Sequence, residues 1–296
     1  MSFVTANGIE MCVEEHGPAS ARPLLLIAGF SAQLVSWDPG FLDSLVDRGF
    51  RVITFDNRDA GLSHHFDGVD SRIGEILAST LNGDGDAPRP TGPYLLSDMA
   101  QDALGVLSAF DLESAHVVGA SMGGMIAQMV AILAPDRVKT LTSIMSTTSE
   151  PEYSRPTPEA QAVLLREPAV GLEATIEGYI ESGRIIGSKT HFDEVAVAGR
   201  ATREYERGMY PEGTARQLAA ILSSGDRAAD LVTLNVPTLV IHGAQDPLIP
   251  LAGGIRTAEL IPAAELLVLD DMGHDLPRPL WGEITGAIDR IATANP

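Results

Sequence analysis

A serine between two glycines is the feature of this sequence whose residue types and spacing most clearly fit a chemical role. The stretch AHVVGASMGGMIAQ places Ser121 between Gly119 and Gly123, directly after an apolar, β-branched run. Three interpretations compete: a sharp turn that presents a nucleophile, a glycine loop that binds phosphate, and an ordinary turn from a strand into a helix. The residues beside Ser121, and others far along the chain, distinguish between them.

The residues that follow the serine do not match a phosphate-binding loop. A Walker-type loop needs a lysine and then a serine or threonine after its second glycine, whereas Gly123 is followed by Gly124 and Met125. The dinucleotide fingerprint fails as well, because no glycine stands two residues after Gly119. The stretch does match Gly-x-Ser-x-Gly between a strand and a helix, where small neighbours allow a tight turn and the serine hydroxyl projects above the sheet.

A nucleophilic serine needs a base, and the base needs an acid that orients it. In this arrangement the three follow the chain in the order serine, acid, histidine, at the ends of successive strands. His242 ends the strand TLVIHG and His191 lies in a helical region, whereas His274, in DDMGHDLP, stands beyond both a strand and a suitable acid. Asp246, in HGAQDPLIP, occupies the acid position. Ser121, Asp246 and His274 are therefore the predicted catalytic residues.

The same chemistry requires two backbone N–H groups that stabilise the oxyanion of a tetrahedral intermediate. The first is expected from Met122, the residue after the nucleophile. The second is expected from the loop that follows the buried strand PLLLIAGF, where Phe30 is the candidate. No step of such a reaction needs a metal or an organic cofactor, and we expect neither.

The elements that must position these residues are short apolar strands alternating with helices. PLLLIAGF, FRVITFD, AHVVGA and TLTSIMST read as buried strands with helical patterns between them, which is typical of parallel βαβ units covered on both faces. From about residue 149 to residue 231 helical patterns follow one another without a clear strand, and strands then resume with VPTLVIHG and AELLVLDDM. We predict an α/β core of residues 1–147 and 233–296, interrupted by a helical cap insertion at 148–232.

The composition describes a well-buried globular protein. The 296 residues are 45% hydrophobic and 20% charged, with a net charge of −20, which argues against binding to nucleic acid or to an anionic membrane. A single cysteine, Cys12, excludes an internal disulfide, and the first residues do not resemble a signal peptide. The apolar runs are too short for a membrane span. We expect a cytoplasmic protein, and the sequence leaves both a monomer and a homodimer open.

A segment rich in proline and glycine, NGDGDAPRPTGPY, follows the FRVITFD strand at some distance. The spacing of Asp84 and Asp86 within it is that of a calcium loop, but the alternating ligands and the terminal glutamate of such a loop are missing. We therefore predict no metal site there, and the segment is a candidate for one rim of the substrate site.

On these residues the sequence resembles the α/β-hydrolase superfamily along nearly its whole length. The resemblance rests on Ala28-Gly29-Phe30, FDNRDAGLS, GASMGG, HGAQDPLIP and MGHDLP. Family members usually have a histidine where Ala28 stands, and a glycine where Asp59 stands in the D-x-R-G-x-G-x-S pattern. With these variants, the chain looks most like the carboxylesterases that include aclacinomycin methylesterase and the mycobacterial lipase-G-type esterases.

The resemblance implies hydrolysis of a small-molecule carboxylic ester, ranging from short and medium acyl esters to methyl or lactone esters of polyketide-like molecules. Cofactor-free haloperoxidases, which carry out perhydrolysis, and carbon–carbon bond hydrolases of the superfamily share the same triad and stay open as alternatives. A non-catalytic, ligand-binding role is a third alternative, against which the complete triad counts.

Specificity is expected to reside in the cap insertion, which in this fold covers the strand ends. The predicted pocket residues share an apolar or aromatic side chain: Tyr179, Ile186, Tyr205, Met209 and Tyr210. We expect at least half of these side chains to form the core of the cap rather than to line the pocket.

Overall fold

A central sheet forms the middle layer of the protein. The computed structural model describes residues 1–82 and 90–296, so Asp84 and Asp86 lie outside the described residues. The strands of the described chain are Ser2–Ala6 (β1), Ile9–His16 (β2), Arg22–Ile27 (β3), Phe50–Phe55 (β4), Ala115–Ala120 (β5), Val138–Ile144 (β6), Thr238–Gly243 (β7) and Glu265–Leu269 (β8). Their order in the sheet is β1-β2-β4-β3-β5-β6-β7-β8. β2 pairs antiparallel with β1 and β4, and all neighbours from β4 to β8 are parallel.

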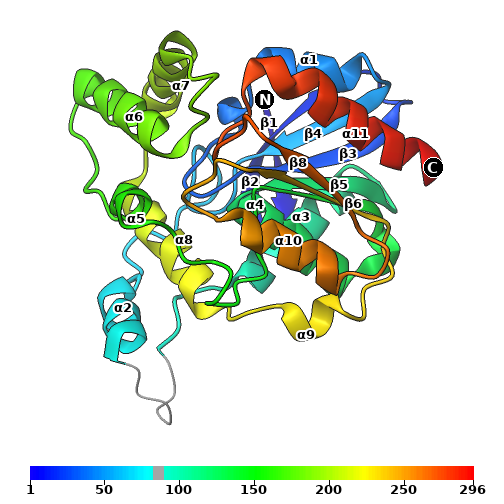
Figure 1. Cartoon of the computed structure of the whole chain (residues 1–296). Helices are drawn as coiled ribbons and strands as arrows, with labels where there is room; N and C mark the ends of the chain where they lie inside the picture. Colours follow the sequence, from blue (N-terminus) through cyan, green and yellow to red (C-terminus); the bar gives the residue numbers. More distant parts are fainter. Residues whose placement is uncertain (83–89) are drawn as a thin grey trace.

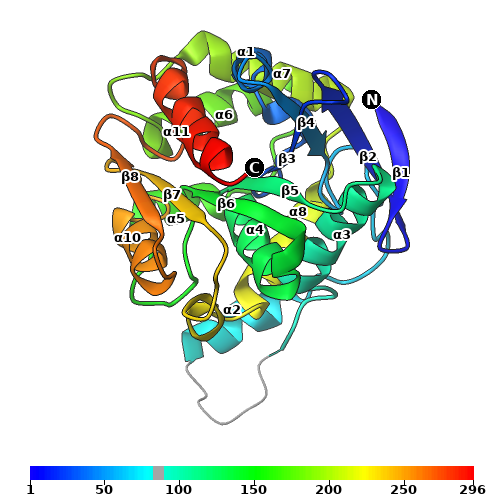
Figure 2. The same cartoon turned by 90° about the vertical axis from the view of Figure 1, so that its right-hand side faces the viewer.

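Helices cover both faces of this sheet (Figures 1 and 2). One face carries α1 (Pro39–Val46) and α11 (Trp281–Ala294), and the other carries α3 (Leu96–Ala109), α4 (Met122–Leu133) and α10 (Leu251–Leu260). Side chains of β3 alternate between the two cores: Leu24 and Leu26 pack under α1 and α11, whereas Leu25 and Ile27 pack under α3 and α4. Because both faces are buried, the strand is apolar from Pro23 to Ile27. The predicted α/β-hydrolase fold is confirmed.

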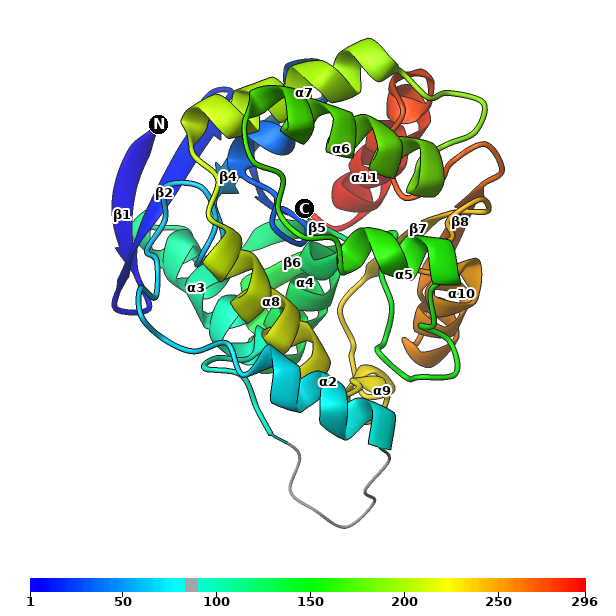
Figure 3. The same ribbon diagram turned by 90° about the vertical axis from the view of Figure 1, so that its left-hand side faces the viewer.

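A run of helices separates β6 from β7. These helices are α5 (Pro158–Leu164), α6 (Leu172–Ile186), α7 (Glu194–Arg207), α8 (Pro211–Ser223) and α9 (Ala228–Leu231). Figure 3 shows α6 and α7 side by side, and α8 next to α2 (Ile73–Asn82). Short 3₁₀ helices complete the described elements: Leu34–Ser36, Pro135–Arg137 and Arg278–Leu280. The helices of this run lie inside the interval 148–232 that the sequence predicted as a cap. That this interval forms a separate unit with these limits stays a prediction.

Two buried ion pairs attach these helices to the loop that follows β4. Arg207, at the end of α7, lies 2.6 Å from Asp56, and Arg216 of α8 lies 2.8 Å from Asp59. All four side chains are 8% exposed or less. Asp59 thus supplies the carboxylate that α8 binds. None of the helices in the described chain is both long and apolar enough to cross a membrane.

The Asp59 carboxylate is held ionised by its donors. Burial raises its pKa, but hydrogen bonds from Arg216, the Phe66 N–H and the Tyr94 hydroxyl outweigh burial, so that the pKa lies below its ordinary value. Because the folded pKa is lowered, this group contributes its full stability above the pKa of the unfolded chain, about 3.9. That contribution is lost as the pH falls below this value toward the folded pKa.

Arg216→Met is expected to lower the free energy of unfolding by about 3–5 kcal/mol, because it leaves a buried carboxylate without its cation. Urea unfolding at pH 7 measures this loss. Arg290→Met is the matched control, since the Arg290–Glu265 pair is exposed, at 61% and 54%, and exposed pairs contribute little. Equal stability of the two variants would contradict the assigned role of the Asp59–Arg216 pair.

Candidate active site

Ser121 occupies a strained turn between β5 and α4. Its backbone has φ 56° and ψ −122°, a conformation that L-residues other than glycine rarely adopt because the Cβ atom crowds the backbone. Two hydrogen bonds hold the turn in place: the Ser121 N–H donates to the Ile144 carbonyl, and the Ser146 hydroxyl donates to the Ser121 carbonyl, both over 2.9 Å. Strain that the surroundings maintain in this way is characteristic of functional sites.

The neighbouring glycines give the turn its clearance. A Cβ atom on Gly119 would clash with the carbonyl of Gly123, and one on Gly123 would clash with the carbonyl of Ile27. A Cβ atom on Gly124 would lie 2.6 Å from the Cβ of Ser146. The glycines therefore allow strand and helix to approach closely, as the sequence predicted.

His274 and Asp246 join Ser121 in one chain of hydrogen bonds. His274 Nε2 lies 3.0 Å from Ser121 Oγ, and His274 Nδ1 lies 2.7 Å from Asp246 Oδ2. The other oxygen, Asp246 Oδ1, accepts the N–H groups of Leu248 and Ile249, each over 2.9 Å. Asp246 follows β7 and His274 follows β8, so the carboxyl ends of parallel strands bring together residues more than a hundred positions apart. The structure thus assembles the three predicted side chains in the predicted order.

A second histidine lies beneath Asp246. His242, at the end of β7, is fully buried, and its Nε2 donates to the Ile249 carbonyl over 2.9 Å. Burial lowers its pKa, so it is neutral, and because a carbonyl can only accept, the proton is on Nε2. His242 therefore holds the turn that presents Asp246, a role that the sequence analysis did not anticipate when it set this histidine aside as the base.

The two predicted oxyanion donors flank Ser121. Met122 begins α4, where the first N–H groups of a helix have no partner within the helix. Phe30 follows Gly29, on which a Cβ atom would lie 3.3 Å from the Ser121 Cβ, so this loop runs close past the serine. Within the described residues we find no protein acceptor for the N–H of Phe30 or of Met122. Both amides are thus available to a bound group, and their role as donors stays a prediction.

The five predicted pocket residues occupy different surroundings. Ile186 contacts the triad region directly, because its carbonyl accepts the His274 N–H over 2.7 Å. The hydroxyl of Tyr179 donates to Glu204 over 2.6 Å, and that of Tyr210 donates to Asp67 over 2.6 Å. The side chains of Tyr205 and Met209 are exposed, at 38% and 42%. The structure brings Ile186 to the triad, and substrate binding by any of the five stays a prediction.

The end of α6 is bound to the loop that carries His274. Ser188 accepts the Gly273 N–H over 3.0 Å, and its own N–H and hydroxyl both donate to Asp275. A Cβ atom on Gly273 would clash with the backbone of Gly187 and Ser188, so only glycine fits at this contact. Sequence reasoning missed Ser188, because no motif marks a single buried serine within a helical insertion.

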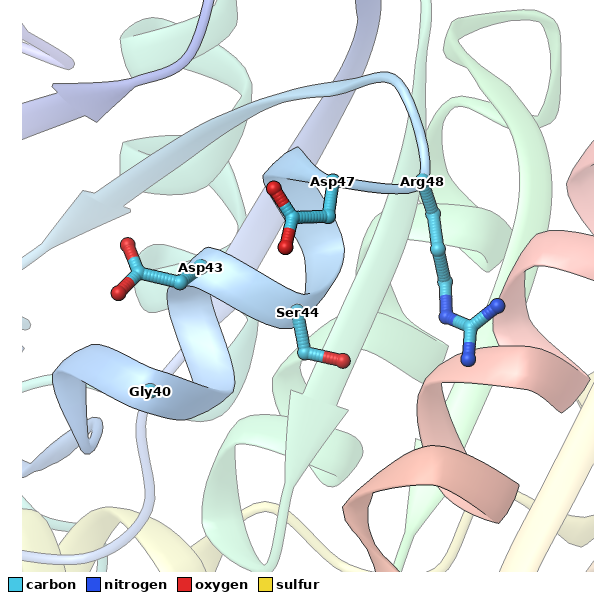
Figure 4. A pocket seen from close by; sticks show the side chains of 5 residues that line it. All are labelled: Gly40, Asp43, Ser44, Asp47 and Arg48. Carbon is cyan, nitrogen blue, oxygen red and sulfur yellow. The ribbon is translucent and has the colours of Figure 1, made fainter.

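A shallow surface hollow elsewhere on the molecule belongs to the packing of α1. It is lined by Gly40, Asp43, Ser44, Asp47 and Arg48. Figure 4 shows the Arg48 side chain extending toward α11, where it donates to the Thr285 hydroxyl and the Gly282 carbonyl. Arg48 thus connects α1 to α11. None of the predicted site residues lines this hollow.

The fold and the strand-to-helix turn at Ser121 define an α/β hydrolase. A model of the alpha/beta hydrolase fold family matches residues 22–277, and the chain belongs to this family. Rhodomycin D methylesterase DauP of Streptomyces sp. (strain C5) is 29% identical over an alignment 313 positions long, which covers 97% of this chain and 96% of DauP. The resemblance to methylesterases that the sequence indicated is thereby confirmed.

Solved structures with the same fold include a lactonase and a meta-cleavage product hydrolase. The enol-lactonase from Burkholderia xenovorans LB400 superimposes with a TM-score of 0.74 at 22% identity, covering 99% of this chain and all of its own. The meta-cleavage product hydrolase CumD from Pseudomonas fluorescens IP01 gives a TM-score of 0.76 at 21% identity, covering 99% and 98%. At this level of identity the similarity concerns the fold alone.

Proposed function

We propose that the protein is a serine hydrolase that cleaves carboxylic esters through an acyl-enzyme on Ser121. The observation that carries this proposal is the unbroken chain of hydrogen bonds from Ser121 through His274 to Asp246. The similarity to a methylesterase over nearly the whole of both chains supports it. For the substrate class we propose esters with a small alcohol group, such as methyl esters, or lactones of polyketide-like molecules.

Each side chain has a defined part in the proposed reaction. Ser121 Oγ attacks the ester carbonyl carbon while His274 Nε2 takes the hydroxyl proton, and Asp246 accepts the hydrogen bond from His274 Nδ1–H. The N–H groups of Phe30 and Met122 stabilise the oxyanion of the tetrahedral intermediate. The alcohol leaves with the proton from His274, and water, deprotonated by the same histidine, then releases the acid and restores the serine.

The helices between β6 and β7 are proposed to act as a cap that selects the substrate. They contact the loops after β4 and β8 through Arg216 and Ser188, so they lie over the carboxyl ends of the strands, where Ser121 is located. Ile186 is the best-placed pocket residue, because its backbone binds that of His274.

A cytoplasmic location and a homodimer are further proposals. Cell fractionation tests the location, and analytical ultracentrifugation tests the oligomeric state.

The wild-type protein is expected to hydrolyse p-nitrophenyl acetate and butyrate, and kcat/KM over a panel of substrates then defines the ester. The panel contains acyl esters of increasing length, methyl esters of aromatic polyketides, and macrocyclic lactones. Methyl esters are expected to give the highest values.

The alternatives that share the triad are tested on the same preparation. Acetate with hydrogen peroxide tests perhydrolysis, and a ring-cleavage dienoate tests carbon–carbon bond hydrolysis. A higher kcat/KM for either than for every ester would replace the proposed reaction. Absence of turnover on all substrates, combined with tight binding of an ester, would favour the non-catalytic role.

A further inference from the structure

A glutamine of α8 binds the loop that carries the candidate oxyanion donor. Gln217 is fully buried, and its Oε1 accepts the Ser31 N–H over 2.9 Å. Its Nε2 donates to the Arg58 carbonyl over 2.7 Å. One side chain of the helical insertion therefore joins two core loops, those after β3 and β4, and both of its polar atoms are used.

The loop after β3 is a tight turn in an unfavourable conformation. The Ala32 N–H donates to the Gly29 carbonyl over 3.3 Å, which places Phe30 and Ser31 at the two central positions. Ser31 has φ 53°, a left-handed value that favours glycine and is strained for serine. Such a conformation persists only when surrounding contacts maintain it.

Contacts on both sides of Phe30 fix this turn. On one side, the Asn57 side chain donates to the Ala28 carbonyl over 3.0 Å. On the other side, the Ser31 N–H is held by Gln217. The side chain of Ser31 forms none of the hydrogen bonds found among the described residues, so this strained residue is held by the bond that closes the turn and by the contact with Gln217. Phe30 N–H, between these two anchors, faces no protein acceptor in the described chain.

The helix that supplies Gln217 is itself fixed beside this turn. The preceding residue, Arg216, forms two hydrogen bonds with the Asp59 carboxylate, at 2.8 and 2.9 Å. Gln217 also binds the carbonyl of Arg58, the residue before Asp59. Arg216 and Gln217 of α8 thus bind Asp59 and Arg58 of the core. These two adjacent contacts fix the position of the glutamine amide.

We propose that Gln217 is a positioning residue for ester hydrolysis, which holds the turn of residues 29–32 so that the Phe30 N–H points at the oxyanion. The inference rests on the proposed function, because an oxyanion forms only if Ser121 attacks a carbonyl group. It assigns to the helical insertion a part in transition-state stabilisation besides substrate selection. The hydrogen bond that matters is the one accepted from Ser31 N–H.

Gln217→Met removes both hydrogen bonds and nearly preserves the side-chain volume. We expect kcat for p-nitrophenyl butyrate to fall by about 10–100-fold with KM within about threefold of wild type, because an oxyanion donor displaced by about 1 Å loses much of its effect. The affinity for a trifluoromethyl ketone, whose adduct with Ser121 carries an oxyanion, should fall by the same factor as kcat/KM. A change in ground-state binding alone would instead raise KM.

Gln128→Met is the matched control. Gln128 is likewise a fully buried glutamine whose amide forms two side-chain hydrogen bonds, to Arg227 and Ser143, on α4. This variant is expected to lose thermal stability to a similar extent while kcat stays within twofold of wild type. A comparable loss of kcat in both variants would overturn the proposal, since the effect would then follow from stability.

Gln217→Glu separates positioning from stability. The carboxylate keeps an acceptor for the Ser31 N–H but faces the Arg58 carbonyl with a second acceptor, so the fold should be destabilised at least as much as by Gln217→Met. We expect this less stable variant to retain more kcat than Gln217→Met. The reverse order would overturn the proposal. Failure of the proposed function itself has a different signature, which is absence of wild-type turnover and of the ketone adduct.

Discussion

Replacing Ser121 with alanine is expected to lower kcat for p-nitrophenyl butyrate by about 10⁶-fold, with the fold retained. Without the hydroxyl no acyl-enzyme forms, and His274 and Asp246 have no nucleophile to activate. Stopped and continuous assays of the purified variant measure the loss. Labelling with a fluorophosphonate provides a second measurement, because this reagent bonds covalently to an activated serine and should modify the wild type at Ser121.

Ser143→Ala is the control for that result. Ser143 is a serine buried within β6, one strand away from Ser121, and its hydroxyl accepts a hydrogen bond from Gln128. This variant should keep its activity and its labelling. Comparison with Ser121→Gly tests the strain of the turn, since glycine adopts a positive φ without cost and should melt at a higher temperature than Ser121→Ala. Undiminished hydrolysis by Ser121→Ala would exclude Ser121 as the nucleophile.

The arrangement of the triad could be predicted from the sequence because its signals are local. Gly119 and Gly123 mark the turn at Ser121, and each remaining member lies in the loop after a strand. In a parallel sheet the carboxyl ends of the strands share one edge, so residues placed after β5, β7 and β8 meet without any knowledge of distances. The alternation of strands and helices predicted the parallel sheet because it, too, is a local signal in the sequence.

The supports of the site could not be predicted, because they depend on contacts between distant segments. Gln217 lies in α8 and Ser188 lies just after α6, neither within a motif, and their partners are 186 and 87 residues away. His242 was visible in the sequence, but its effect on the turn of Asp246 requires the position of the Ile249 carbonyl. These residues act on backbone groups, which every residue possesses, so residue types give no signal for them.

Aromatic residues of the insertion show a related limit. Tyr179 lies in α6 and Tyr210 lies immediately before α8, but the sequence does not show which polar group each hydroxyl contacts. Tyr179 binds Glu204, 25 residues on, and Tyr210 binds Asp67, 143 residues back. Their hydroxyls therefore join the insertion to itself and to the core.

The local geometry of Asp246 makes Asp246→Asn a sharper test than removal of the side chain. Asp246 Oδ1 accepts two backbone N–H groups, from Leu248 and Ile249, while Oδ2 faces His274 Nδ1. In the asparagine variant the amide oxygen must occupy the first position, because the amide nitrogen would set donors against both N–H groups. The amide N–H then points at His274 Nδ1.

This orientation forces the wrong tautomer on the base. With Nδ1 accepting a hydrogen bond, the imidazole proton moves to Nε2, which then presents N–H instead of a lone pair to Ser121 Oγ and cannot take its proton. We expect kcat to fall by about 10⁴-fold at pH 7, with KM and thermal stability close to wild type. Asp270→Asn, an exposed substitution in the turn before His274, should leave kcat unchanged. A loss of less than tenfold in Asp246→Asn would show that another group orients His274, since the amide cannot support the productive tautomer.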